Sequence, residues 1–328
     1  KNPKDQPFLA LDVQGTSHKE SFMNLALTPN IGKSYGYFGV NWDRKSDYDD
    51  YNNDGFGDDV NLSRFSIFNK WNIHRESKKE FIISARYYFE DRRNGVKEYL
   101  INNNYKKIRG DNKIYGESIY TNRFELFGKY EFAFTDGFEV NYSYSKHDQN
   151  SYYGSDYYQA NQDIFFSQFT LDRKYGNHDL LFGASIKNNL YDDNTVATQS
   201  VVNGTIINKN SNQLIPGLLI QNQYKPSEKI SLIGGLRVDH FNEHGFIYAP
   251  SFHLKYNPGE WLSLRLNVGT GFRLVNLFTE DHAFITGQRE VKILEELKPE
   301  ESKSLIFNTN YIYTGLNGSG NIDLDLFY

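Results

Sequence analysis

The chain has no cysteine, one methionine and no long apolar run. The absence of cysteine excludes disulfide scaffolds, cysteine zinc sites, iron–sulfur ligation and thiol nucleophiles. No apolar stretch approaches the roughly 20 residues that a membrane-spanning helix needs, so a helical membrane protein is excluded too. Lysine and arginine number 36 against 41 aspartates and glutamates, a formal net charge of −5. Because unspecific nucleic-acid binding needs a basic surface, this balance argues against a nucleic-acid partner.

Aromatic residues, in contrast, are abundant. The 328 residues include Tyr 25, Phe 25 and Trp 3, or 16% of the chain, although hydrophobic residues make up only 38%. A disordered chain lacks aromatic residues at this level. Many aromatic side chains at low overall hydrophobicity are typical of a membrane β-barrel, in which only alternate residues face lipid.

Apolar and polar residues alternate with a period of two in about fifteen segments, which predicts β-strands. The segments are about ten residues long, whereas strands of soluble proteins average about five or six and tilted membrane-spanning strands need about 9–11. A helix cannot place such alternate residues on one face, because they lie about 200° apart around its axis. The clearest examples are 123–132, 138–145, 230–239, 262–271 and 322–326.

Short turns and long polar loops also alternate along the chain, as they do in transmembrane barrels with tight periplasmic turns and extended outer loops. The alternative is a soluble barrel or sandwich whose apolar face points inward, since alternation alone does not distinguish the two. The expected short turns are 76–79, 135–137, 176–177, 226–229 and 257–260. The expected long loops are 45–60, 93–116, 150–161, 193–212 and 278–302.

Several short motifs, taken in order, resemble TonB-dependent outer-membrane receptors over nearly the whole chain. They are GLRVDH at 235–240, LRLNVGTGFR at 264–273 and LKPE at 297–300. Three further motifs resemble the Bacteroidetes branch of that family: DGFGD at 54–58, FNKW at 68–71 and YYFEDR at 87–92. The chain departs from the family at Val275, where a proline is expected, and we expect residues 1–328 to include no plug domain or TonB box.

The resemblance implies an all-β fold: an antiparallel transmembrane β-barrel, incomplete, with about 15 of about 22 strands. We therefore expect residues 1–328 to form one partial barrel domain in the outer membrane of a Gram-negative bacterium. The implied function is import of a scarce nutrient, with energy from the TonB complex acting through the absent plug. Cobalamin is the favoured nutrient, followed by an iron siderophore or haem. No enzymatic reaction and no organic cofactor are expected, and the partners are outer-membrane lipid, the small-molecule ligand and a surface lipoprotein.

Two functions from other classes remain alternatives. One is a passive porin-like barrel, which lacks a plug. The other is a secreted soluble β-rich protein that binds glycans and stays in solution without detergent.

The acidic stretch DYNNDG is a candidate calcium site. It places oxygen-bearing side chains at positions one, three and five and glycine at six, as calcium loops do. Position twelve is Asn61 instead of the usual bidentate glutamate, so the motif is not a complete EF-hand. The resemblance adds weight, because cobalamin receptors of the family use calcium-bound aspartates to order outer loops. The alternative is a solvated acidic loop. The predicted ligands are Asp50, Asn52, Asp54 and Asp58, with Asp47, Asp49 and Asp59 nearby.

Aromatic residues in an expected outer loop are candidates for ligand binding. Tyrosine rings can stack on a planar ligand such as a corrin, haem or catecholate. The alternative is packing within the loop or an interfacial aromatic belt. The candidates are Tyr152, Tyr153, Tyr157 and Tyr158, together with His282 and Arg289 in a second loop. The alternation places a set of charges on the inward face: Arg123, Glu125, Lys129, Arg237, Asp239 and Arg265.

Overall fold

The structure is a computed structural model that describes residues 6–202, 204–242, 244–273, 298–315 and 318–328. Its main element is a 16-stranded antiparallel sheet. The first strands are β1 (Leu9–Gly15), β2 (Glu20–Leu27), β3 (Asn30–Ile31), β4 (Ser34–Lys45), β5 (Asn61–Asn72), β6 (Phe81–Gly95), β7 (Gly116–Glu131) and β8 (Phe138–Tyr153). The others are β9 (Asp156–Tyr175), β10 (His178–Asp193), β13 (Ser211–Ser227), β14 (Ile230–Phe241), β15 (Gly245–Gly259), β16 (Leu262–Arg273), β17 (Glu300–Gly315) and β18 (Gly318–Phe327).

The remaining elements are small and lie between long strands. A separate hairpin consists of β11 (Gln199–Val202) and β12 (Thr205–Asn208). Between β6 and β7 the chain forms α1 (Lys97–Leu100), the 3-10 turn η2 (Ile101–Asn103) and α2 (Tyr105–Ile108). Within the described ranges, no helix has the length and apolar character needed to cross a bilayer.

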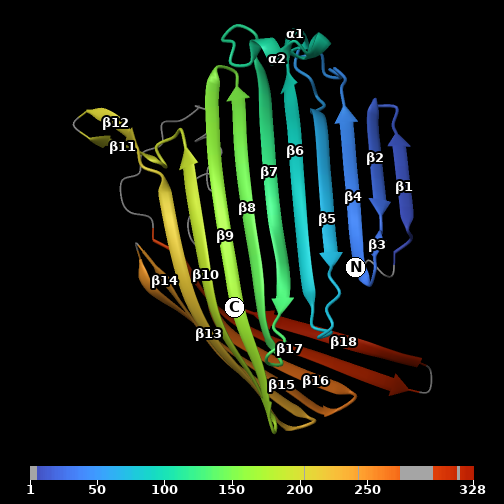
Figure 1. Ribbon diagram of the computed structural model, residues 1–328, viewed down its shortest axis with the longest axis vertical. Coiled ribbons are helices and arrows are strands. Elements are labelled where there is room, and N and C mark those ends of the chain that lie inside the picture. Colours follow the sequence, from blue (N-terminus) through green and yellow to red (C-terminus); the bar gives the residue numbers. More distant parts are fainter. Residues whose placement is uncertain (1–5, 203, 243, 274–297, 316–317) are drawn as a thin grey trace.

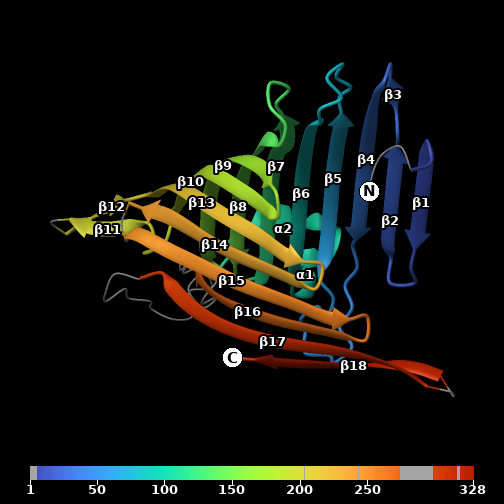
Figure 2. The same cartoon turned by 90° about the horizontal axis from the view of Figure 1, so that it is seen from below.

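The strands follow one another in the sheet in the order of the sequence, apart from β3, which pairs with β4 alone. Figures 1 and 2 show that the sheet curves strongly, with β1 to β8 on one side and β14 to β18 on the other. Among the described residues β1 and β18 do not pair with each other, so the sheet is open. The prediction of an all-β fold with strands of barrel length is thereby confirmed, and the strands form an open, curved sheet.

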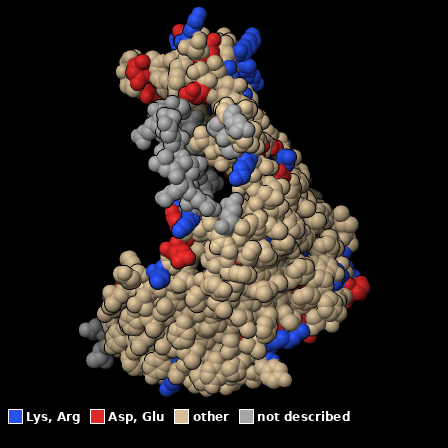
Figure 3. Space-filling model, turned by 90° about the vertical axis from the view of Figure 1, so that its left-hand side faces the viewer, with Lys and Arg blue, Asp and Glu red and all other residues tan. Residues whose placement is uncertain are grey.

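The two faces of the sheet differ in chemistry. Cross-strand partners share a face, and the partners Ile67, Tyr87 and Phe124 form one apolar row across β5, β6 and β7. On the opposite, inward face the same strands carry charged partners such as Arg64 with Glu90. Figure 3 shows a broad surface with few charges over the lower part of the side that it presents, and clusters of charge at the upper end. The apolar outward face suits lipid, which favours the transmembrane barrel over the soluble alternative.

The predicted strands are confirmed, and several are longer than expected. Segment 123–132 lies within β7 except for Phe132, and segment 138–145 lies within β8; the two strands have 16 residues each. Segments 230–239, 262–271 and 322–326 lie within β14, β16 and β18. Their length allows strands to extend beyond the bilayer at the end that bears the long loops.

One predicted long loop is wrong. Residues 150–161 do not form a loop, because β8 continues to Tyr153 and β9 begins at Asp156. The turn needs only two residues, since Gly154 adopts a positive φ of 62°, which glycine accepts without strain. Residues 145–151 are polar throughout, so this part of the strand is maintained by its pairing with β7 and β9 and not by alternation.

Candidate functional site

The inward face of β4, β5 and β6 carries a chain of ion pairs. The Nε and Nη2 atoms of Arg64 donate to Oε2 of Glu90 at 2.8 and 2.6 Å, and the Tyr88 hydroxyl donates to the same oxygen at 2.8 Å. Asp43 lies 3.7 Å from Arg64 on its other side, and Arg92 lies 3.4 Å from Glu90. Neighbouring strands place these side chains opposite each other, because Arg64 and Glu90 are direct cross-strand partners.

A second group of charges adjoins the first on β6 and β7. Glu125 forms ion pairs with Arg123 at 2.8 Å and with Arg86 at 3.6 Å. Unlike Arg64, both arginine side chains are nearly half exposed, at 46% and 48%. The two groups border a polar hollow of about 510 Å³, which is lined by Asn41, Arg64, Ser66, Arg86, Tyr88, Arg123 and Glu125. Three arginines and one carboxylate line the hollow, so it favours an anionic occupant.

The four predicted tyrosines do not form one cluster. Tyr152 and Tyr157 are cross-strand partners on the outward face, with ring centroids 4.9 Å apart. Tyr153 and Tyr158 lie on the inward face, where Tyr153 packs against the buried Tyr158. The split follows from the hairpin, because successive residues of a strand point to opposite faces. Tyr153 and Tyr158 thus face the same side of the sheet as the arginine hollow.

Tyr158 belongs to a hydrogen-bonded chain at the outer ends of β9 and β10. Its hydroxyl lies 3.0 Å from that of Tyr191, which donates to Oδ2 of Asp193 at 2.8 Å. Asp193 Oδ1 accepts from Thr195 and Thr198, which begin the excursion to β11. Tyr158 therefore anchors the rim, and its ring is not free to stack on a ligand, since it is 1% exposed.

The short helices between β6 and β7 add contacts that the sequence did not predict. The Tyr105 hydroxyl donates to Oδ2 of Asp91 at 2.7 Å, and the Arg93 guanidinium lies 4.6 Å from the Tyr105 ring centroid. Burial raises the pKa of Tyr105 above the range of an ordinary phenol, so the hydroxyl remains a donor. The available signal was the presence of two large aromatic residues, Tyr99 and Tyr105, in an otherwise polar segment. Both side chains are buried against the sheet.

The acidic loop between β4 and β5 is ordered by its own side chains. Asp50 accepts backbone N–H bonds from Asp54 and Gly55 at 3.1 and 3.0 Å, and Asn52 accepts one from Asp54 at 2.9 Å. The Asn52 amide also donates to the carboxylates of Asp54 and Asp58 at 3.1 and 3.4 Å. Three of the four predicted calcium ligands are therefore in contact, and Asp50 is joined to them through the Asp54 backbone. Carboxylate and amide oxygens are suitable calcium ligands.

A different trio in the same region also brings metal-ligating atoms together. Among the described residues, His18, Asp49 and Asp59 have atoms within 4.8 Å of one another. Asp59 also pairs with Lys45 at 2.8 Å, so a cation of the protein already neutralises part of this group. Nearby, the hydrogen bond from Lys19 lowers the pKa of Asp47, which ties the β1–β2 turn to the acidic loop.

Two predicted rim residues lie outside the described residues. These are His282 and Arg289, which fall between 274 and 297. Their role as ligand contacts stays a prediction.

An antiparallel sheet of long strands, with an apolar outward face and a charged inward face, defines the class of outer-membrane β-barrel walls. Within that class, residues 22–328 match the family model described as TonB dependent receptor-like, beta-barrel. The chain belongs to this family. Members of the family are outer-membrane transporters of Gram-negative bacteria and not enzymes.

Solved structures with a similar fold include siderophore receptors. The chain is similar to the ferric enterobactin receptor PfeA of Pseudomonas aeruginosa, solved as a variant with enterobactin, at 16% identity and a TM-score of 0.66, with 97% of this chain and 53% of that chain covered. PirA of Pseudomonas aeruginosa matches at 12% identity and a TM-score of 0.61, with 90% of this chain and 50% of that chain covered. FpvA of P. aeruginosa, bound to heterologous pyoverdines, matches at 12% identity and a TM-score of 0.63, with 97% of this chain and 48% of that chain covered.

The chain thus spans about half the length of these solved structures. At such low identity the likeness concerns the fold alone. A search among curated proteins found no match.

Proposed function

We propose that this chain forms part of the barrel of a TonB-dependent importer whose cargo is an anionic iron–siderophore chelate. The observation that carries the proposal is the inward hollow with Arg64, Arg86 and Arg123 on its walls. The half-exposed guanidinium groups of Arg86 and Arg123 retain unused donors, which can bind carboxylate or catecholate oxygens. The siderophore-receptor relatives named above are consistent with this cargo.

Cobalamin is the second candidate cargo, and haem the third. The acidic loop favours cobalamin, because of the calcium-bound outer loops that the resemblance implies. The same partners are expected for each of these cargoes. TonB acts through a plug domain, and a surface lipoprotein of the Bacteroidetes type delivers the ligand.

Removing a positive charge from the hollow is expected to lower siderophore affinity, and removing its negative charge is expected to raise it. Arg123→Gln removes one charge-assisted contact worth about 1.5–3 kcal/mol, so affinity falls about tenfold or more. Glu125→Gln releases Arg123 and Arg86 from their carboxylate, so affinity rises severalfold. Binding is measured by fluorescence quenching of the purified full-length protein with a ferric catecholate chelate. Misfolding would instead lower the siderophore affinity of both variants.

A control and a second readout complete this experiment. Lys113→Gln removes a cation from the outer loop, away from the hollow, and leaves affinity unchanged. Uptake by cells stops when the proton-motive force is collapsed, whereas a passive pore continues to conduct. Equal affinities for all variants would rule out the hollow as the anion site. Tight cobalamin binding without chelate binding would make cobalamin the cargo.

We propose further that the acidic loop binds Ca²⁺ through Asp50, Asn52, Asp54 and Asp58. For these oxygens to reach one ion, the Asn52 amide turns its oxygen toward the carboxylates that it now donates to. When bound, the ion would order the outer loop beside the entrance. No step of transport is assigned to it.

Substituting Asp54 is expected to weaken metal binding at least tenfold. Terbium luminescence, sensitised by Tyr48, measures the affinity directly, since the Tyr48 hydroxyl lies 3.2 Å from Asp50. The matched control is Asp111→Asn, because Asp111 also accepts backbone N–H bonds in an outer loop. If Asp54→Asn and Asp111→Asn bind terbium as the unaltered protein does, the loop is not the site.

A further inference from the structure

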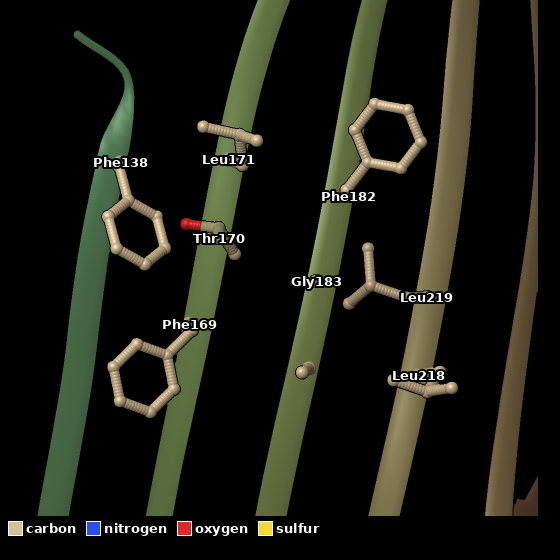
Figure 4. A pocket seen from close by; sticks show the side chains of 9 residues that line it. Phe138, Phe169, Thr170, Leu171, Phe182, Gly183, Leu218 and Leu219 are labelled. Atoms are coloured by element: carbon tan, nitrogen blue, oxygen red, sulfur yellow. The ribbon is translucent and has the colours of Figure 1, made fainter. Parts of the chain in front are cut away.

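The outward face of β8, β9, β10 and β13 contains an apolar hollow of about 380 Å³. Its walls are Phe169, Phe182 and Leu218, which are 41%, 40% and 67% exposed. Between them lies Ala184, whose cross-strand partners are Phe169 and Leu218. The smallest side chain is therefore surrounded by large ones, and the surface is recessed at that point. Figure 4 shows these four strands side by side, with Phe138 and Phe169 on neighbouring strands and Leu219 reaching toward Gly183.

The hollow lies on the lipid side and extends from Leu218 to Phe138, the first residue of β8 after a short turn. Phe169, Phe182 and Leu218 share the outward face with Ile220 and Leu236, as the pairing register requires. At the end with this short turn, Phe134 and Tyr175 are strongly exposed, at 74% and 79%. Aromatic residues in such positions mark the level of the lipid headgroups, and short turns mark the periplasmic side.

A cation lies at this level beside the hollow. Arg173 is two residues beyond Leu171 on β9, about 7 Å further toward the turn on the same outward face. Its guanidinium donates to the carbonyl oxygens of Asp136 and Asp172 and to the Thr135 hydroxyl. These partners are neutral, and none of the ion pairs found among the described residues includes Arg173. The exposed Asp136 carboxylate also interacts electrostatically with Arg173, but its ion pair at 2.6 Å is with Lys79, so Arg173 presents a cation without an ion pair of its own beside the short turn.

We infer that this hollow and Arg173 form a binding site for one phospholipid of the periplasmic leaflet. The acyl chain lies over Ala184 between Phe169, Phe182 and Leu218, and the phosphate contacts Arg173. A phospholipid fits because one molecule has both an apolar chain and an anionic phosphate at its end. The site is independent of the cargo, since it lies on the opposite face from the arginine hollow.

The test measures phospholipid retained by the full-length protein after detergent purification and addition of phosphatidylglycerol, by native mass spectrometry. Unaltered protein retains one lipid. Ala184→Phe fills the hollow, and Arg173→Gln removes the phosphate contact, so each lowers retention at least fivefold.

Two matched control variants are expected to retain the lipid. Lys174→Gln removes the neighbouring cation, which points to the inward face and pairs with Asp179 at 3.9 Å. Gly234→Phe adds a ring elsewhere on the outward face, where nothing lies within 4 Å of a new Cβ. Heat-modifiable migration on gels reports folding of every variant. The inference is overturned if Ala184→Phe and Arg173→Gln retain as much lipid as the unaltered protein, or if the controls lose as much as they do.

Discussion

Replacing Ile220 by lysine is expected to destabilise the folded protein in lipid by about 2–4 kcal/mol. Ile220 lies on the outward face between Phe182 and Leu236, its partners on β10 and β14. It is four residues, or about 13 Å along a tilted strand, from Tyr224. Tyr224 stacks on His178 at 4.5 Å and marks the periplasmic aromatic girdle. Since the apolar band is about 25 Å tall, Ile220 lies near its middle, where a charge is least tolerated.

The matched variant is Gln221→Lys, one residue further along β13. Its side chain points to the polar inward face, so the free energy of unfolding is expected to change by less than about 1 kcal/mol. Both variants are compared by urea titration of the protein refolded in lipid vesicles, followed by tryptophan fluorescence. An equal loss of stability in the two variants would mean that the apolar face is not the lipid face.

The second large effect is expected at Gly217 on β13. Gly217 lies beneath the pair formed by Arg237 and Asp239, which are joined by bonds of 2.6 and 2.7 Å. A Cβ at Gly217 would meet Oδ1 of Asp239 first, then Oγ of Ser185 at 2.9 Å and Nη2 of Arg237 at 3.1 Å. Asp239 is 1% exposed and cannot move aside freely. Gly217→Ala is therefore expected to lower the free energy of unfolding by roughly 1–3 kcal/mol.

Gly234 on the adjacent strand provides the comparison. Nothing lies within 4 Å of a Cβ built there, and its φ is not in the left-handed region. Gly234→Ala should be neutral or stabilise the protein by up to about 1 kcal/mol, because alanine reduces the entropy of the unfolded chain. The same urea titration measures both variants. If Gly217→Ala is as stable as Gly234→Ala, the Arg237–Asp239 pair has more freedom than its burial indicates.

Strand positions and facing could be predicted from the sequence because they depend on local alternation. The inward charges Arg123, Glu125, Arg237 and Asp239 were assigned correctly, since parity along one strand determines the face. The hollow itself could not be derived in this way. Arg64, Arg86 and Arg123 belong to three strands, and only the register between strands brings them together.

The prediction of a long loop at 150–161 failed for the opposite reason. Polar composition favoured a loop at 150–161, although a single glycine with positive φ was enough to turn the chain tightly. Once the segment is a hairpin, Tyr152 and Tyr157 necessarily face away from Tyr153 and Tyr158. The short helices after β6 were missed because single helical turns have too few residues to show a period.

The β11–β12 hairpin leaves the main sheet undisturbed. β10 and β13 pair without interruption from His178 with Tyr224 to Tyr191 with Ser211, although a complete hairpin is inserted between them in the sequence. In evolutionary terms, the outer end of the protein can gain or lose such excursions while the membrane wall keeps its register. Recognition and membrane insertion can then diverge separately, so related chains should vary most in length between β10 and β13 and least within the strands.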